Sequence, residues 1–239
     1  MAVATVPDLL FGCWKRAWIK FADGTVDDTI HNTATVVWLQ TESLMVDVRI
    51  NIDPLHIAQR SGLHDCTIDE LHALALNDAS SGFTECGPPV VGADGLRGAT
   101  ASWHTRGHGI SFQPVSAFPE PGLMTWNADA TVMMEYAPSG AYIEEWRLVP
   151  GSQDPLSVTQ SGSRTTFRSG AVAVFVRDRG VPIPRLARLP ELIDEYREDR
   201  TMIEQLLDCE FSVAELNEGE WRISASTLPW RQGAILDVE

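Results

Sequence analysis

Short segments in which apolar and polar residues alternate dominate this chain. The clearest runs from Leu44 to Ile52, with Leu44, Val46, Val48, Ile50 and Ile52 on one set of positions and Met45, Asp47, Arg49 and Asn51 on the other. Side chains two apart share a face of a strand, so each such segment predicts a β-strand. Similar patterns predict strands at residues 14–21, 33–41, 82–86, 99–105, 110–118, 122–127, 131–137, 141–149, 156–160, 165–169, 171–177, 210–216, 220–226 and 233–238.

Two segments have the 3.6-residue period of a helix instead. Thr67 and Glu70 have the spacing of a capping box, which predicts a short helix ending near Asn77. Apolar residues from Leu189 to Asp208 form one stripe, and Pro190 suits the first helical position, so we expect one long helix there. The pattern as a whole predicts a mainly β protein with one short and one long helix.

Aromatic residues gather in the first predicted strand. Trp14, Arg16 and Trp18 would share one face, and Cys13, Lys15, Ala17 and Ile19 the other. Two indoles around a guanidinium suit the lumen of a β-barrel, where aromatic side chains shape a cavity and one charge orients a polar ligand. The alternative is structural, with an indole buried under an arginine as a plug at the barrel end.

These residues also carry a family resemblance. Gly12-x-Trp14 followed by antiparallel hairpins resembles the lipocalin-like (calycin) superfamily, and Ala101-Ser-Trp103 with Glu144-Glu145-Trp146-Arg147 is similar to its HRI-type family, known from fungi and bacteria. The resemblance covers the middle of the chain. It implies a β-barrel and no settled activity, so it assigns no catalytic residue. The segment 189–208 is later and more acidic than the closing helix of a lipocalin.

The length of 239 residues suits a single lipocalin-like unit over 1–239. The Gly- and Pro-rich span 87–98 offers a boundary between 1–90 and 99–239. Segments 35–49 and 131–147 echo each other as strand–turn–strand units ending in Asp-Val-Arg and Glu-Trp-Arg. Two related half-barrels would produce this echo, and so would two unrelated hairpins.

The acidic balance narrows the range of partners. A net charge of −15 and a pI near 4.7 disfavour nucleic acid and anionic membrane surfaces. No stretch reaches the ~20 apolar residues of a membrane helix, and no signal peptide is evident. Four cysteines without CxxC spacing do not form a disulfide framework, so we expect a reduced, cytoplasmic protein. A homodimer is compatible with the sequence.

Polar residues on predicted strands provide candidate chemistry. Asp47 and Arg49 share a face, which would be a charge pair near the ligand if that face is inward; the favoured interpretation is a solvated outer face. Tyr142, Glu144 and Trp146 share another face, where Glu144 is a candidate general acid or base. An ordinary hairpin with one wet face is the alternative.

His104 is a candidate proton shuttle beside Trp103, although a rim histidine would look the same. Its partner at i+4, His108, follows across a Gly turn, where that spacing does not indicate a metal site. The chain has no phosphate-binding glycine loop and no G-x-S-x-G elbow. We therefore expect neither metal nor cofactor.

The hypothesis that combines these observations is a cofactor-independent lyase, isomerase or hydrolase acting by acid–base chemistry on a small aromatic or unsaturated acid. Arg16 and Arg49 would bind the anion, and His104 or Glu144 would move the proton. Trp14, Trp18, Trp103, Tyr142 and Trp146 would line the site. A non-catalytic carrier or sensor with the same pocket, and an interaction domain with a filled barrel, are the alternatives.

Overall fold

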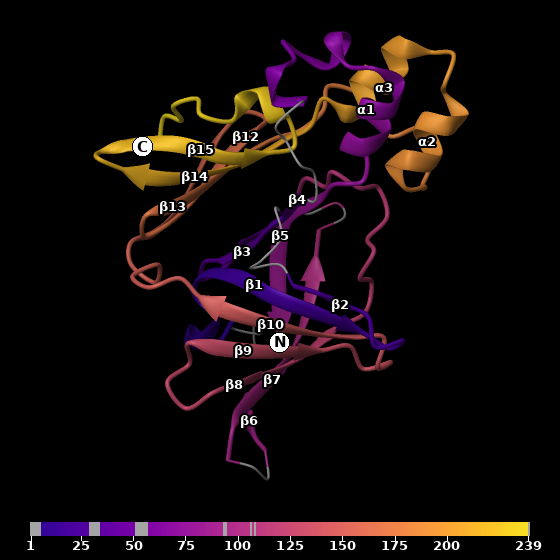
Figure 1. Ribbon diagram of the computed structural model, residues 1–239. Coiled ribbons are helices and arrows are strands. Elements are labelled where there is room, and N and C mark those ends of the chain that lie inside the picture. Colours follow the sequence, from indigo (N-terminus) through magenta and orange to yellow (C-terminus); the bar gives the residue numbers. More distant parts are fainter. Residues whose placement is uncertain are drawn as a thin grey trace.

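The structure, a computed structural model, contains a closed eight-stranded antiparallel β-barrel (Figure 1). It describes residues 6–28, 34–50, 57–92, 95–105, 107 and 109–238. The barrel strands are β1 (Gly12–Phe21), β3 (Thr35–Gln40), β4 (Met45–Ile50), β5 (Asp78–Cys86), β7 (Arg97–His104), β8 (Gly122–Trp126), β9 (Val132–Tyr136) and β10 (Tyr142–Leu148). Each pairs with the next, and β10 pairs with β1, so the barrel is an up-and-down meander.

Two short strands and three 3₁₀ turns accompany the barrel. β2 (Val26–Asp27) pairs with β1, and β6 (Val90–Val91) pairs with β7. The turn Asp8–Leu10 precedes β1, and two more, Ile57–Gln59 and Leu63–Asp65, lie between β4 and β5. The span 87–98, predicted as a domain boundary, connects β5 with β7, which are neighbours in the same barrel sheet.

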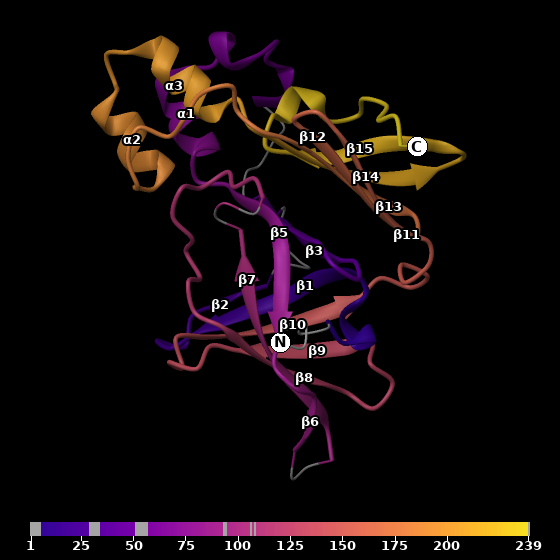
Figure 2. The same cartoon turned by 180° about the vertical axis from the view of Figure 1, so that it is seen from behind.

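The C-terminal part of the chain forms a second sheet of five strands (Figure 2). Its order is β11 (Leu156–Ser161), β12 (Arg164–Ser169), β13 (Val172–Arg177), β14 (Glu210–Asn217) and β15 (Glu220–Ser226), followed by a 3₁₀ turn at Pro229–Arg231. Beside it lie three helices, α1 (Ile68–Leu74), α2 (Leu189–Glu195) and α3 (Arg200–Leu207). No helix in the described part of the chain has the length and apolar character needed to span a bilayer.

The largest hydrophobic core lies between the barrel, the second sheet and the helices. Val46, Val48 and Ile50 point from β4 into this core, where Val174 and Phe211 of the second sheet also lie. The opposite face of β4, with Asp47 and Arg49, faces the barrel lumen, where Arg49 binds Glu144 of β10 and both residues line a cavity. The expectation that Asp47 and Arg49 form a solvated outer face is therefore wrong, because the second sheet covers the apolar face instead.

A β-bulge divides the first strand. Arg16 pairs with Trp146 and Trp18 with Glu145, so the register shifts at Ala17. A bulge adds one residue and turns the following side chains to the other face. Trp14 and Arg16 therefore face the lumen, whereas Trp18 faces outward, and the predicted single stripe of Trp14, Arg16 and Trp18 is wrong.

The segment predicted as one long helix contains two. α2 ends at Glu195, because the next residue, Tyr196, has φ and ψ of −95° and 21° and so leaves the helical region. Asp199 then begins α3, because its side chain accepts a hydrogen bond from the Met202 backbone N–H. The apolar stripe continues from α2 into α3. The periodicity of apolar residues therefore did not indicate that the segment contains two helices.

Other local predictions have mixed outcomes. The Thr67–Glu70 capping box is confirmed, with both reciprocal hydrogen bonds present. Residues 110–118 form a loop with one bridge from Ser111 to Ser80, and residues 233–238 contribute only the bridge between Ile235 and Arg222. Thr33, Asn51 and Ile52 lie outside the described residues.

Candidate functional site

A cavity of about 870 Å³ opens at one end of the barrel. The barrel strands contribute Trp38, Arg49, Trp103, Glu135 and Trp146 to its wall. The loop 109–121 and the connection 178–186 after β13 complete it. The cavity therefore lies where the barrel meets the chain leaving the second sheet.

Aromatic rings form the apolar part of the wall. Trp38 makes edge-to-face contacts with Trp103 at 6.0 Å and with Trp146 at 6.1 Å between ring centroids. Phe118 lies across from them, with the Arg49 guanidinium 4.5 Å above its ring. Arg49 also lies 5.6 Å from the Trp146 ring, so one cation joins both aromatic walls.

A buried ion network occupies the lumen beside the cavity. The Oε1 atom of the fully buried Glu144 accepts hydrogen bonds from Arg16 Nη1 at 2.9 Å and Arg49 Nη1 at 3.0 Å. Arg49 Nε also donates to Asp47 at 2.9 Å, and Arg16 Nη2 to Asp27 at 3.1 Å. Both arginines predicted to bind a ligand anion therefore already bind carboxylates of the protein.

Glu135 is a buried acidic residue of the cavity wall that the sequence interpretation missed. It lies on β9, opposite Glu144 on β10, and is 3% exposed. Burial, together with the charge of Glu144, raises its pKa to about 8. The Tyr142 hydroxyl donates a hydrogen bond to Glu135 Oε1 at 3.3 Å. Near neutral pH Glu135 is thus an uncharged acid with a proton to donate.

A sequence signal for Glu135 did exist. Met133 and Glu135 are two apart in β9 and therefore share one face of the strand. The hairpin turn at Pro138–Gly140 sets the register between β9 and β10. Folding that predicted hairpin symmetrically brings Glu135 opposite Glu144. The residue was overlooked because Glu144 alone was considered as the acid.

Five of the predicted site residues do not line the cavity: Trp14, Arg16, Trp18, Tyr142 and Glu144. Trp14 is fully buried beside the 3₁₀ turn Asp8–Leu10, where its Nε1 donates to the Leu10 carbonyl at 2.9 Å. Trp18 lies on the outer face and donates to Glu145 Oε2 at 3.1 Å. Arg16 lines a smaller adjoining cavity of about 430 Å³.

His104 lies at the rim, on the strand face opposite to that of Trp103. It pairs in register with Phe83 and stacks on that ring at 4.6 Å. Its Nε2 lies 3.0 Å from Glu85 Oε2, and 37% of the side chain is exposed. The imidazole is therefore directed to an outer-face carboxylate and not to Glu144. His108 lies outside the described residues, among which no cluster of three metal-ligating side chains occurs.

The four cysteines are buried and unpaired. Burial raises the pKa of Cys13 to about 12 and that of Cys86 to about 11, and it also raises the pKa of Cys66 and Cys209. These thiols are protonated near neutral pH and are packed, not poised as nucleophiles.

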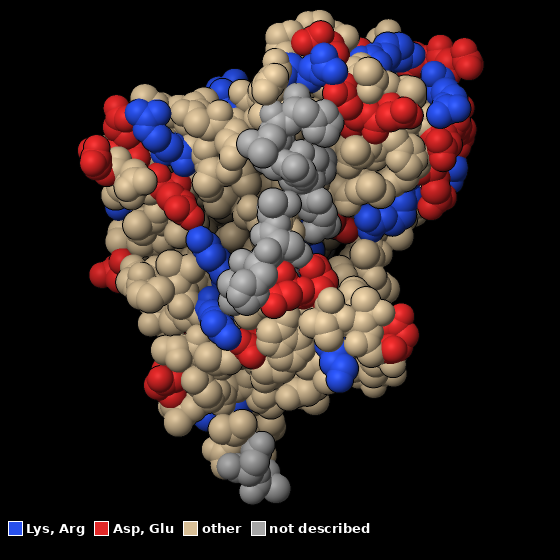
Figure 3. Space-filling model, viewed as in Figure 1, with Lys and Arg blue, Asp and Glu red and all other residues tan. Residues whose placement is uncertain are grey.

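On the face of the molecule in Figure 3, lysine and arginine side chains are scattered among acidic ones. The barrel fold is compatible with small-molecule binding. No protein-family model, curated protein or solved structure matches this chain. The cavity and its residues are therefore the basis for a functional assignment.

Proposed function

We propose that this protein binds a small organic molecule in the barrel cavity. The observation that carries the proposal is the cavity of about 870 Å³, which has aromatic rings on two sides and a few buried polar groups. Ligand sites in proteins combine this size with an apolar lining and a small number of directing polar groups. An interaction domain with a filled barrel would have no such cavity.

The lining favours a ligand with a flat apolar body. Trp103 and Phe118 are partly exposed and line the cavity, and the nearly fully buried Trp38 and Trp146 pack beside Trp103 and Arg49. Aromatic rings in a cavity wall bind aromatic groups well. The inner network has no cation in excess near neutral pH, because Arg16 and Arg49 face three carboxylates, those of Glu144, Asp47 and Asp27. The inner lumen therefore suits the body of the ligand more than a free anion.

The family resemblance agrees with this proposal. The Gly12-x-Trp14 pair begins the first strand of a closed meander barrel, and Trp14 packs beside the 3₁₀ turn Asp8–Leu10. These features support a place among lipocalin-like proteins of the HRI type. A cytoplasmic ligand-binding role would accord with the unpaired thiols.

The test is quenching of intrinsic tryptophan fluorescence by small aromatic acids, hydroxy acids, haem and uncharged aromatic analogues. Saturable quenching is expected for the wild type and should be reduced in Trp38→Phe and Trp146→Phe. Trp18→Phe, which alters an indole on the outer face, is the matched control and should retain it. Absence of saturable quenching throughout the panel would contradict the proposal.

Acid–base catalysis on the bound molecule is the second candidate, favoured by the state of Glu135. Its protonated carboxyl could transfer a proton to a basic oxygen of the ligand, leaving a carboxylate that later regains a proton from water. Glu144, held by two arginines, would remain the charged member of the pair. A carrier or sensor needs no such acid.

Glu135→Gln separates these candidates. For an enzyme, turnover of a ligand found by quenching should fall at least 100-fold while the dissociation constant changes little. The wild-type rate should also fall as pH rises above about 8, where Glu135 loses its proton. Unchanged ligand after prolonged incubation with the wild type would favour a carrier.

A further inference from the structure

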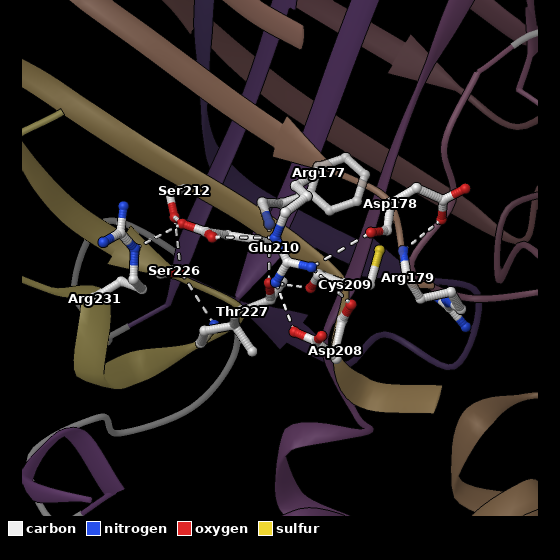
Figure 4. A network of polar contacts seen from close by, with 12 residues as sticks. Arg177, Asp178, Arg179, Asp208, Cys209, Glu210, Ser212, Ser226, Thr227 and Arg231 are labelled. Carbon is white, nitrogen blue, oxygen red and sulfur yellow. Dashed lines mark hydrogen bonds and ion pairs between the residues drawn. The ribbon is translucent and has the colours of Figure 1, made fainter. Parts of the chain in front are cut away.

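Arg179 differs from the other arginines near the cavity. It follows β13 on the connection that forms part of the cavity wall, and only 7% of it is exposed. Figure 4 shows its side chain leading away from Glu210, around which Arg177 and Arg231 gather. Arg179 therefore belongs to the cavity and not to that ion cluster.

The contacts of Arg179 involve no carboxylate at its guanidinium among the described residues. Nη2 donates to the carbonyl oxygens of Ser111 at 3.0 Å and Phe112 at 2.6 Å. Asp178 Oδ1 accepts from the backbone N–H of Arg179 at 2.8 Å. Nη1 is buried and makes no hydrogen bond. The adjacent Cys209 is a neutral thiol, because burial raises its pKa, so it does not balance the charge.

Neighbouring arginines have acidic partners. Arg177 binds Asp208 at 2.6 Å, Arg188 binds Asp78 at 3.1 Å, and Arg49 binds Asp47 and Glu144. A buried cation without a counter-charge is unfavourable. Arg179 lines the cavity, and its Nη1 has no partner among the described residues, so an anion bound beside this guanidinium gains more than it would in water.

We propose that Arg179 binds an anionic group of the ligand, so that the ligand is an aromatic or otherwise apolar acid. This inference rests on the proposed function and gives it a substrate class. It assigns the anion to Arg179 in place of Arg16 and Arg49, whose charges are taken by protein carboxylates. The planar guanidinium matches a carboxylate or sulfonate, while the apolar body of the ligand occupies the tryptophan-lined part of the same cavity.

Two probes that differ only in charge test the inference. 1-Anilinonaphthalene-8-sulfonate carries a sulfonate, and N-phenyl-1-naphthylamine has the same ring system without it. Titrations followed by probe fluorescence would compare the wild type with Arg179→Gln and Arg179→Lys. Arg185→Gln is the matched control, since Arg185 lies on the same connection but is exposed and bound to Glu195.

We expect Arg179→Gln to raise the dissociation constant of the sulfonate probe at least ten-fold and that of the uncharged probe less than two-fold. Arg179→Lys should recover part of the preference, and Arg185→Gln should change neither constant. Equal weakening of both probes with a lower melting temperature would overturn the inference, leaving Arg179 as a clamp on residues 111 and 112. An unaffected sulfonate probe would also overturn it. Failure of both probes to bind the wild type would contradict the proposed function itself.

Discussion

Glu135 and Glu144 lie directly opposite each other on β9 and β10, and both face the lumen of the barrel. Two carboxylates in this position repel each other, so the pair is stable when one of them is protonated. Arg16 and Arg49 both bind Glu144, which keeps the charge there. Glu135 consequently holds the proton, and its pKa is raised to about 8.

The raised pKa of Glu135 predicts a pH-dependent stability. The folded protein holds this proton up to about pH 8, whereas the unfolded chain loses it near the ordinary value of 4.5. The unfolded state therefore binds fewer protons between these values, so the free energy of unfolding falls as pH rises through this window. In Glu135→Gln, the decrease in the free energy of unfolding across this pH window should be smaller by on the order of 2–4 kcal/mol. Urea unfolding at several pH values measures it.

The control for this prediction is Glu198→Gln, which changes an exposed glutamate. It should leave the slope of stability against pH as in the wild type. Asp47 and Asp78 also have raised pKa values from burial, so part of the slope should remain in Glu135→Gln. An identical slope in the wild type and Glu135→Gln would contradict a protonated Glu135.

Replacing Glu144 tests the coupling between the two carboxyl groups. Glu144→Gln removes the neighbouring negative charge, so the pKa of Glu135 should fall toward its ordinary value while the effect of burial persists. Carbon-13 NMR titration of the Glu135 carboxyl would measure the change. The same variant leaves Arg16 and Arg49 without their shared partner, and we expect a loss of about 3 kcal/mol in stability. A Glu135 pKa that does not move would show that the two groups are independent.

Arg16 is expected to stabilise the barrel more than it binds ligand. Arg16→Met removes a buried partner of Glu144 and of Asp27, which should cost about 2–4 kcal/mol of unfolding free energy. Lys15→Met, on the exposed outer face, should cost less than about 1 kcal/mol. Binding of the uncharged naphthylamine probe to folded Arg16→Met should stay within two-fold of the wild type. If Arg16→Met lost probe affinity but kept the stability of the wild type, Arg16 would be a ligand-binding residue, contrary to this prediction.

Gly122 lies so close to two side chains of the cavity wall that a larger residue would collide with them. A Cβ atom there would lie 2.6 Å from Trp103 Cη2 and 3.0 Å from Glu135 Oε1. Gly122→Ala should therefore displace both side chains and destabilise the protein by about 1–3 kcal/mol. Gly180→Ala, with open space around the added methyl group, is the control. Thermal unfolding of the two variants makes the comparison, and equal melting temperatures would contradict close packing at Gly122.

Much of the barrel could be predicted from local pattern. Alternation marked most of its strands, and the shared face of Tyr142, Glu144 and Trp146 follows from strand geometry alone. The bulge at Ala17 could not be predicted in this way, because no residue type there marks an extra position. That one insertion reverses the orientation of Trp18. After a bulge, alternation therefore assigns side chains to the wrong face, even when the strand itself is predicted correctly.

The other features that the sequence did not predict depend on contacts between residues far apart in the chain. Arg49 and Glu144 are 95 positions apart, and nothing local indicates that they meet. The apolar face of β4 was consistent with an inward core, but the second sheet covers it from outside. Arg179 lies 67 residues from Phe112, whose carbonyl it binds. These arrangements depend on how the sheets pack, which is a property of the whole chain.

Ligand binding within the barrel cavity is the central claim, and a fluorescence titration with N-phenyl-1-naphthylamine tests it most directly. Ser80 faces the lumen opposite Asp47 and lines the cavity, so Ser80→Phe would fill it. We expect saturable one-site binding to the wild type, and at least ten-fold weaker binding to Ser80→Phe with its circular dichroism spectrum unchanged. Ser116→Phe, in the exposed part of the loop, provides a second filling variant. No saturable binding to the wild type, or binding that neither variant weakens, would contradict the claim.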